Sequence, residues 1–292
     1  MSVEKTQPTV GTPGALREGV TGSMADLGVR LLSGAALGAV GVGLLYAGIW
    51  PFTVMLLIIA LLMTWEWGHI VRGPDIDAVL IIHGVAVIAA ALLAAAGYAA
   101  PALIVLIAGT LVVIALRFGE NSRLSAVGVL YVGLPAVALI ALRGNAMFGF
   151  QAVLFILLAV VATDTFAYFA GRAIGGPKLW QLISPKKTWA GLVGGVIGAA
   201  LTGFVFALFV PGAVPVRLAI IGLVLGLVAQ GGDLAESALK RHFHVKDASH
   251  LLPGHGGFMD RMDGLVVAAI VAMLIGLAGN IYAPARALLL GF

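Results

Sequence analysis

Residues 151–173 read QAVLFILLAVVATDTFAYFAGRA, an apolar run that contains a single acid, Asp164, and a single base, Arg172. About 20 predominantly apolar residues are enough for a helix to cross the hydrocarbon core of a bilayer. The period-two alternation that a membrane barrel needs is absent. We therefore expect an all-α, polytopic transmembrane helix bundle of about nine spans, at about 28–48, 51–70, 78–98, 101–116, 125–142, 151–173, 190–210, 214–234 and 264–284.

The composition supports this class. Of the 292 residues, 61% are hydrophobic and only 10% are charged, and the mean hydropathy is +1.09. Soluble domains are about 45–50% apolar and about 25% charged, so this chain has too little polar surface to coat a water-soluble globule. Cysteine is absent, which excludes disulfides, thiolate metal sites and cysteine nucleophiles.

Polarity divides the chain into three regions. Residues 1–27 are polar and lack the pattern of a secretory signal, so we expect a retained, poorly ordered cytoplasmic tail. Residues 28–150 form amino-terminal spans of mostly plain hydrocarbon. Residues 151–292 carry polar loops and acids within helices, and we expect the catalytic region there.

The basic residues predict the orientation. When consecutive loops are assigned alternately to the two sides, one side receives Arg143, Arg217 and Arg286, and the other receives the remaining 14 of the 17 lysines and arginines. This imbalance predicts a multi-pass protein of the inner cell membrane with a cytoplasmic amino terminus and an external carboxyl terminus. Because the bases are spread between spans, the net charge of +4 does not indicate nucleic-acid binding.

Several polar residues in the spans have more than one interpretation. Asp164 shares a helical face with Tyr168 and Arg172, which is compatible with an internal ladder or with a ligand for a cation or substrate. We favour the ligand. For Glu66, beside Trp65 and Trp67, we expect a solvated carboxylate in an interfacial belt. We expect His83 to be a hydrogen-bonded packing residue, and the small residues of the seventh span to pack within the bundle: Gly191, Gly194, Gly195 and Gly198.

Two polar stretches suggest phosphate and metal binding. Ser184-Pro185-Lys186-Lys187-Thr188 precedes a span and suits a helix amino terminus, whose free N–H groups attract phosphate. Further on, one helical face carries an acid followed by bases, and two acids at i and i+3 begin the next span. The residues concerned are Asp233, Ser237, Lys240 and Arg241, then Asp260 and Asp263. Carboxylates with Lys and Arg suit a hard cation, magnesium above all, and phosphoryl or nucleotidyl transfer.

The run from Ser237 to Asp263 resembles, without a gap, the signature of the phosphatidate cytidylyltransferase family, also called CDP-diacylglycerol synthase. Asp164, Tyr168, Gly171 and Arg172 and the stretch 184–189 also resemble the family, so the likeness covers about residues 160–265. Family members often carry a glutamate after the tryptophan, where this chain has Ala190. The positions of the signature that admit one residue type are all matched: Ser237, Lys240, Arg241, Lys246, Asp247, His255, Gly256, Gly257, Asp260, Arg261 and Asp263.

The resemblance implies an enzyme that transfers the cytidylyl group of CTP to phosphatidic acid at the cytoplasmic face, with magnesium, a second cation being left open. Homodimers are common among members. Carried over, the catalytic residues are Asp233, Asp260, Lys187 and Lys246, and the metal ligands are Asp233, Asp260, Asp263 and Asp164. The implied substrate-binding residues are Arg172, Lys186, Lys187, Lys240, Arg241, Lys246, His255, Gly256, Gly257 and Arg261.

Two alternatives remain. A cation-coupled transporter would also place an acid such as Asp164 within the membrane and break a span near Gly231. An inactive scaffold of the same fold is the other, and Ala190 is the residue that suggests it. Most of the acids lie at predicted cytoplasmic helix ends beside phosphate-suited bases, which favours the enzyme.

Overall fold

A computed structural model of the chain describes residues 34, 36–73, 75–116, 121–246, 248–249 and 256–292. The chain forms two compact units divided after Gly41. In the first unit the described residues are helical. The predicted tail, residues 1–27, lies outside the described residues. A short apolar helix, Ala36–Ala47, is the described part of the first predicted span.

Among the described residues, eight helices are long and apolar enough to cross a membrane, and each overlaps one of the other eight predicted spans. The prediction of an all-α, multi-pass bundle is therefore confirmed. The helices are α2 (Ile49–Arg72), α3 (Ala78–Ala95), α4 (Ala99–Leu116), α5 (Ser122–Arg143), α6 (Gly149–Ala173), α7 (Trp189–Ala207), α8 (Pro215–His242) and α9 (Met259–Gly279).

Helix α8 is longer than the predicted span 214–234. Its 28 residues correspond to a length of about 42 Å, whereas the hydrocarbon core of a bilayer is about 30 Å thick. The helix continues through a polar segment because the side chains of Asp233, Ser237 and Lys240 form hydrogen bonds or ion pairs there. The carboxyl-terminal turns of α8 can therefore hold charged side chains beyond the apolar core.

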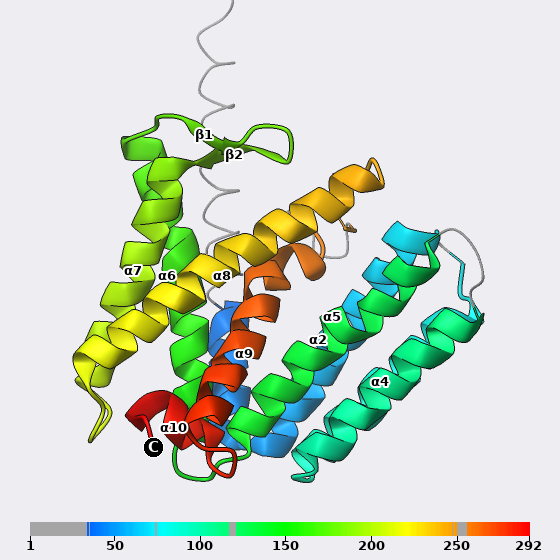
Figure 1. Cartoon of the computed structure of the whole chain (residues 1–292), viewed down its shortest axis with the longest axis horizontal. Helices are drawn as coiled ribbons and strands as arrows, with labels where there is room; N and C mark the ends of the chain where they lie inside the picture. The colour runs from blue at the N-terminus through cyan, green and yellow to red at the C-terminus, as the bar shows by residue number, and fades with distance from the viewer. Residues whose placement is uncertain (1–33, 35, 74, 117–120, 247, 250–255) are drawn as a thin grey trace, which may run out of the picture. The chain divides into compact units, whose positions relative to one another are not determined.

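Close helix packing in the carboxyl-terminal half depends on glycine. Helix α7 packs against both α6 and α8, and α8 packs against α9 (Figure 1). A methyl group on Gly195 would lie 2.6 Å from Nε2 of Gln230 in α8 and 2.7 Å from the carbonyl oxygen of Thr163 in α6. The prediction that these glycines serve packing within the bundle is confirmed.

A β-hairpin and a short helix were not predicted. Strands β1 (Lys178–Trp180) and β2 (Ser184–Thr188) form an antiparallel hairpin between α6 and α7. A short helix, α10 (Pro284–Leu290), follows α9. Figure 1 shows the hairpin and α10 at opposite ends of the helices, so the end that carries the hairpin can be recognised by it.

Candidate functional site

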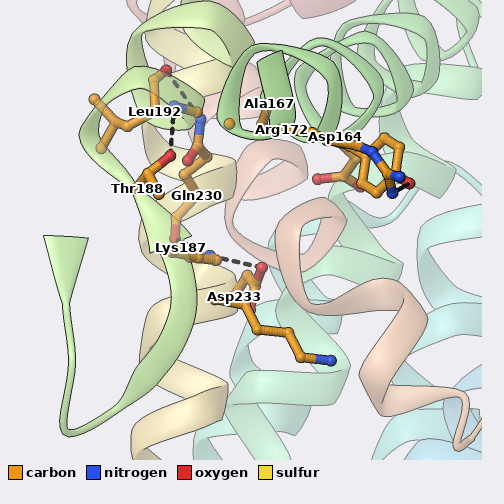
Figure 2. A pocket seen from close by; sticks show the side chains of 12 residues that line it. Asp164, Ala167, Arg172, Lys187, Thr188, Leu192, Gln230 and Asp233 are labelled. Carbon is orange, nitrogen blue, oxygen red and sulfur yellow. Dashed lines mark hydrogen bonds and ion pairs between the residues drawn. The ribbon is translucent and has the colours of Figure 1, made fainter. Parts of the chain in front are cut away.

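A cavity of about 380 Å³ lies where the end of α6, the hairpin and the start of α7 meet α8. Figure 2 shows acids and bases from these elements around it. Its polar lining mixes the two acids with bases in the way that a phosphate and a divalent ion would require. The lining residues are Asp164, Ala167, Tyr168, Gly171, Arg172, Lys186, Lys187, Thr188, Gly191, Leu192, Gln230 and Asp233.

The α6 side of the cavity carries Asp164, Tyr168 and Arg172. Arg172 donates a hydrogen bond from Nη1 to the Tyr168 hydroxyl, with a distance of 3.2 Å. Of the alternative ladder of Asp164, Tyr168 and Arg172, the contact between Tyr168 and Arg172 is therefore present. Asp164 is exposed and lines the cavity, which is the position that the ligand interpretation requires.

The α8 side is defined by an ion pair. Lys187 Nζ lies 2.6 Å from Oδ2 of Asp233 and also donates to the carbonyl oxygen of Gln230 at 3.4 Å. Ser237, one helical turn further along α8, donates to Oδ1 of Asp233 at 3.3 Å. The Asp233 side chain remains 34% exposed and that of Lys187 19%. Both side chains are therefore accessible to a ligand in the cavity.

The expected helix amino terminus at Ser184 is wrong. Residues 184–188 are strand β2, and α7 begins at Trp189 after Thr188, whose hydroxyl accepts a hydrogen bond from the N–H of Gly191 at 3.0 Å. The strand forms because Trp189 N–H bonds to the carbonyl oxygen of Pro177 and β2 pairs with β1. The extended backbone still brings Lys186 and Lys187 to the cavity.

Gln230 is a cavity residue that the sequence interpretation missed. It is 6% exposed, and its Nε2 donates to the carbonyl oxygen of Leu192 in α7 at 3.1 Å. This bond joins α7 to α8 about one helical turn before Asp233. A lone amide side chain within the span 214–234 was the signal that could have identified it.

A second polar cluster lies at the start of α9. Lys240 Nζ is 2.5 Å from Oδ1 of Asp260 and 3.4 Å from Oε1 of the buried Glu236. Oδ2 of Asp260 accepts hydrogen bonds from the N–H groups of Ala248 and Gly257, at 3.0 and 2.9 Å. Asp260 and Lys240 do not line the cavity. Asp260 thus pairs with Lys240, and its role as a metal ligand stays a prediction.

Asp263 and Arg261 connect the start of α9 to the cavity. Asp263 experiences the negative charges of Asp233 and Asp164, whereas Asp164 experiences the positive charge of Arg261. Oδ1 of Asp263 accepts a hydrogen bond from the N–H of Gly264 at 2.6 Å. A methyl group on Gly232 would lie 2.5 Å from the carbonyl oxygen of Asp263, so this residue of α9 packs against α8 next to Asp233.

The other predicted contact residues lie outside the cavity lining. Arg241 and Lys246 are exposed. Gly256 has a positive φ of 80°, and the N–H of Gly257 is used by Asp260. His255 lies outside the described residues. For these residues substrate contact stays a prediction.

The expectation for Glu66 is wrong. Instead of a solvated carboxylate it is fully buried, at 0% exposure, and accepts hydrogen bonds from residues around the start of α9. The physical reason is that α2 packs against α9, so this side chain meets unsatisfied N–H groups. His83 is also buried, as expected of a packing residue, whereas the hydrogen bond that was also expected of it stays a prediction.

The donor set of the cavity fits magnesium. Among the described residues, no three His, Cys, Asp or Glu side chains form a group that could hold an ion unaided. Magnesium commonly takes only one or two protein carboxylates and fills its other positions with water and substrate phosphates. Asp164 and Asp233, which line one cavity, supply that number.

Comparison with known proteins identifies a family and several relatives. A model of the cytidylyltransferase family matches residues 28–278. The phosphatidate cytidylyltransferase of Brucella abortus biovar 1 is 36% identical over 261 residues, which cover 87% of this chain and 94% of that protein. Proteins of the same name from Bacillus subtilis and Staphylococcus saprophyticus are 39% and 44% identical over 138 and 137 residues, about half of each chain.

Proposed function

The chain belongs to the cytidylyltransferase family, and we propose that it transfers CMP from CTP to phosphatidic acid, giving CDP-diacylglycerol and pyrophosphate. The observation that carries this proposal is the cavity at the ends of membrane helices, where two carboxylates face Lys186, Lys187 and Arg172. A lipid phosphate and a nucleotide are both anionic, so a site for both needs several cations. The names of the relatives supply the substrate class.

The chemistry needs no protein nucleophile. The monoester phosphate of the lipid has a second pKa of about 6 and is largely dianionic at neutral pH. One of its oxygens attacks the α-phosphorus of CTP, and the bond from that phosphorus to the bridging oxygen breaks as pyrophosphate leaves. Catalysis then consists of holding two anions in line and neutralising the charge that develops on the leaving group.

The cavity bases serve this neutralisation. Lys187 exchanges its contact with Asp233 for a phosphate oxygen of CTP, and Lys186, beside it on β2, contributes a second positive charge. Arg172, oriented by Tyr168, contacts the lipid phosphate. Asp164 and Asp233 would hold magnesium, with Asp263 close by. When bound, the ion withdraws electron density from the phosphate oxygens and lowers the charge repulsion between the two substrates.

The location of the cavity suits a lipid substrate. It lies at the helix ends to which the sequence assigns most of the bases, so we assign this end to the cytoplasmic face of the inner membrane, with the carboxyl terminus external. CTP then enters from the cytoplasm, and phosphatidic acid enters from the adjoining leaflet. Many large apolar side chains on α3, α4 and α7 are exposed, as lipid contact requires.

An assay with four nucleotides tests the proposal. Purified protein in phosphatidate-containing vesicles with Mg²⁺ should release pyrophosphate with CTP and form CDP-diacylglycerol, and ATP, GTP and UTP should be poor substrates. Asp233→Asn should abolish the reaction and leave the detergent elution profile unchanged. Ion or substrate flux across the vesicles without consumption of any nucleotide would contradict the proposal and support a cation-coupled transporter instead.

A further inference from the structure

Glu66 connects the amino-terminal half of the bundle to the segment that begins α9. It lies on α2, and its carboxylate accepts three hydrogen bonds from residues more than 180 positions away in the sequence. Oε1 accepts from the Ser249 hydroxyl at 2.5 Å and from the N–H of Phe258 at 2.9 Å, and Oε2 accepts from the N–H of Met259 at 2.7 Å. The side chain has no exposure to solvent.

These bonds replace a local helix cap. Helix α9 begins at Met259, and its N-cap residue, Phe258, has no side chain that can accept a hydrogen bond from the first turn. The first N–H groups of a helix lack partners within the helix and carry partial positive charge, so a carboxylate is well suited to them. In this protein the carboxylate comes from α2. The position of the first turn of α9 therefore depends on α2.

The same contact explains one glycine of the signature. A methyl group at Gly257 would lie 2.6 Å from Oε1 of Glu66 and 3.0 Å from Cβ of Ala248. The N–H of Gly257 is meanwhile bonded to Asp260. The absence of a side chain at this position thus allows Glu66 and Asp260 to approach the same short segment from two sides.

The first turn of α9 packs against α8 beside the cavity acid Asp233: a methyl group on Gly232 would lie 2.5 Å from the carbonyl oxygen of Asp263. Asp263 interacts electrostatically with Asp233 and Asp164, and Arg261 interacts with Asp164. A small displacement of this turn would change the distances between the acids of α9 and those of α6 and α8. Positioning errors of about 1 Å at such sites can reduce rates on the order of 100-fold.

We infer that Glu66 is a positioning residue for the transfer reaction. It holds the start of α9 so that Asp263 and Arg261 meet Asp164 and Asp233 in the arrangement that the reaction needs. This inference rests on the proposed cytidylyl transfer, because its effect is on that reaction. Glu66 itself contacts neither substrate nor metal.

The test compares Glu66→Gln with Glu66→Asp and with a matched cap variant, Asp77→Ala. Asp77 accepts a hydrogen bond from Leu80 N–H at the start of α3, at 2.8 Å, and its Oδ2 pairs with Nε of Arg72 at 3.0 Å, so its loss removes a helix cap and an ion pair, neither of which involves α9. The assay measures kcat, KM for CTP and the Mg²⁺ concentration for half-maximal rate. The amount of folded protein, judged by thermal unfolding, is used to calculate kcat. Wild-type protein is measured first.

We expect Glu66→Gln to lower kcat about 10- to 100-fold and to raise the half-maximal Mg²⁺ concentration, with KM for CTP changed less than about twofold. Glu66→Asp, which keeps the charge on a shorter chain, should recover part of kcat. Asp77→Ala should lower the unfolding temperature and leave kcat unchanged. If Glu66→Gln does not accumulate as folded protein, Glu66→Asp carries the test, with the same split expected between kcat and KM.

One result would contradict the proposed function, and a different result would contradict the positioning role of Glu66. An inactive wild-type protein contradicts the proposed function. An active wild-type protein whose folded Glu66 variants keep the wild-type kcat and Mg²⁺ dependence, even at a lower unfolding temperature, contradicts the positioning role and leaves Glu66 a stability residue only.

Discussion

The ammonium nitrogen of Lys187 lies 2.6 Å from Oδ2 of Asp233, and this contact joins the end of the hairpin to α8. Each partner keeps part of its surface exposed to the cavity. Exposed and half-exposed ion pairs are weak in water, so an arriving phosphate and its cation can separate these two groups without a large cost. The pair thus brings together the base that we propose binds a phosphate of CTP and the acid that we propose binds the metal ion.

Removing the positive charge of Lys187 should reduce turnover. We expect Lys187→Met, which keeps the length of the side chain, to lower kcat/KM for CTP about 100-fold, because one preorganised donor to a developing phosphate charge typically contributes 10² to 10³. Lys187→Arg should retain more activity. Steady-state pyrophosphate release measures both. Lys178→Met in β1, an exposed lysine outside the cavity lining, is the control and should behave as wild type.

Removing magnesium should abolish the reaction, and its restoration should depend on the cavity acids. After treatment with EDTA, we expect Mg²⁺ to restore wild-type activity, whereas Asp164→Asn should need roughly tenfold more Mg²⁺ because one of the two carboxylates that we propose as ligands is lost. Asp75→Asn, an exposed acid in the loop after α2, provides the control. An unchanged Mg²⁺ titration for Asp164→Asn would leave Asp164 without a role in metal binding.

Arg172 is expected to act on the lipid and not on the nucleotide. Its contact with the Tyr168 hydroxyl at 3.2 Å orients an otherwise exposed guanidinium. We expect Arg172→Ala to raise the KM for phosphatidate about tenfold in mixed micelles, with KM for CTP changed less than about twofold, since an Arg–phosphate contact is charge-assisted and bidentate. Tyr168→Phe should show a smaller effect in the same direction. A rise in KM for CTP alone would assign Arg172 to the nucleotide.

The fold could be predicted because a bilayer imposes a length and a polarity on each span. Eight helices of the described chain coincide with predicted spans for this reason. The chemical character of the site could also be predicted, since acids within apolar runs are costly and require partners. Asp164 and Asp233 do line the same cavity as Lys186 and Lys187.

The sequence pattern could not distinguish which acids meet. Asp233 lies near the end of the predicted span 214–234 and Asp260 lies shortly before the next predicted span, but in the structure Asp233 pairs with Lys187 and Asp260 pairs with Lys240. For Glu66 the flanking tryptophans indicated an interface, and only the packing of α2 on α9 shows the buried contact. The hairpin was missed because three- and five-residue strands carry too little periodicity to be recognised.

A stability prediction concerns the opposite end of the bundle, at Arg217. Its guanidinium, near the start of α8, donates to the carbonyl oxygens of Leu288 and Ala287 at 2.8 and 2.7 Å. These carbonyls belong to the last turn of α10, where a cation is favourable, and the carbonyl oxygen of Ala287 also accepts a hydrogen bond from the N–H of Gly291 at 2.9 Å. Hydrogen bonds to charged groups contribute about 1.5–3 kcal/mol. We therefore expect Arg217→Ala to destabilise the docking of α10 by about this amount.

Hydrogen exchange read by mass spectrometry checks this expectation. Peptides that cover residues 284–290 should exchange faster in Arg217→Ala, while peptides from α6 and the hairpin should not change, because α10 lies at the other end of the helices from the hairpin. Arg286→Ala removes a cation that lies over the Phe292 ring, 5.1 Å from its centroid, and is the control with an arginine lost from α10 itself. It should leave exchange in α9 unchanged.

Turnover with CTP should equal that of wild type in both variants, since neither arginine lines the cavity. Loss of turnover in Arg217→Ala without faster exchange in α10 would contradict this separation between stability at one end and catalysis at the other.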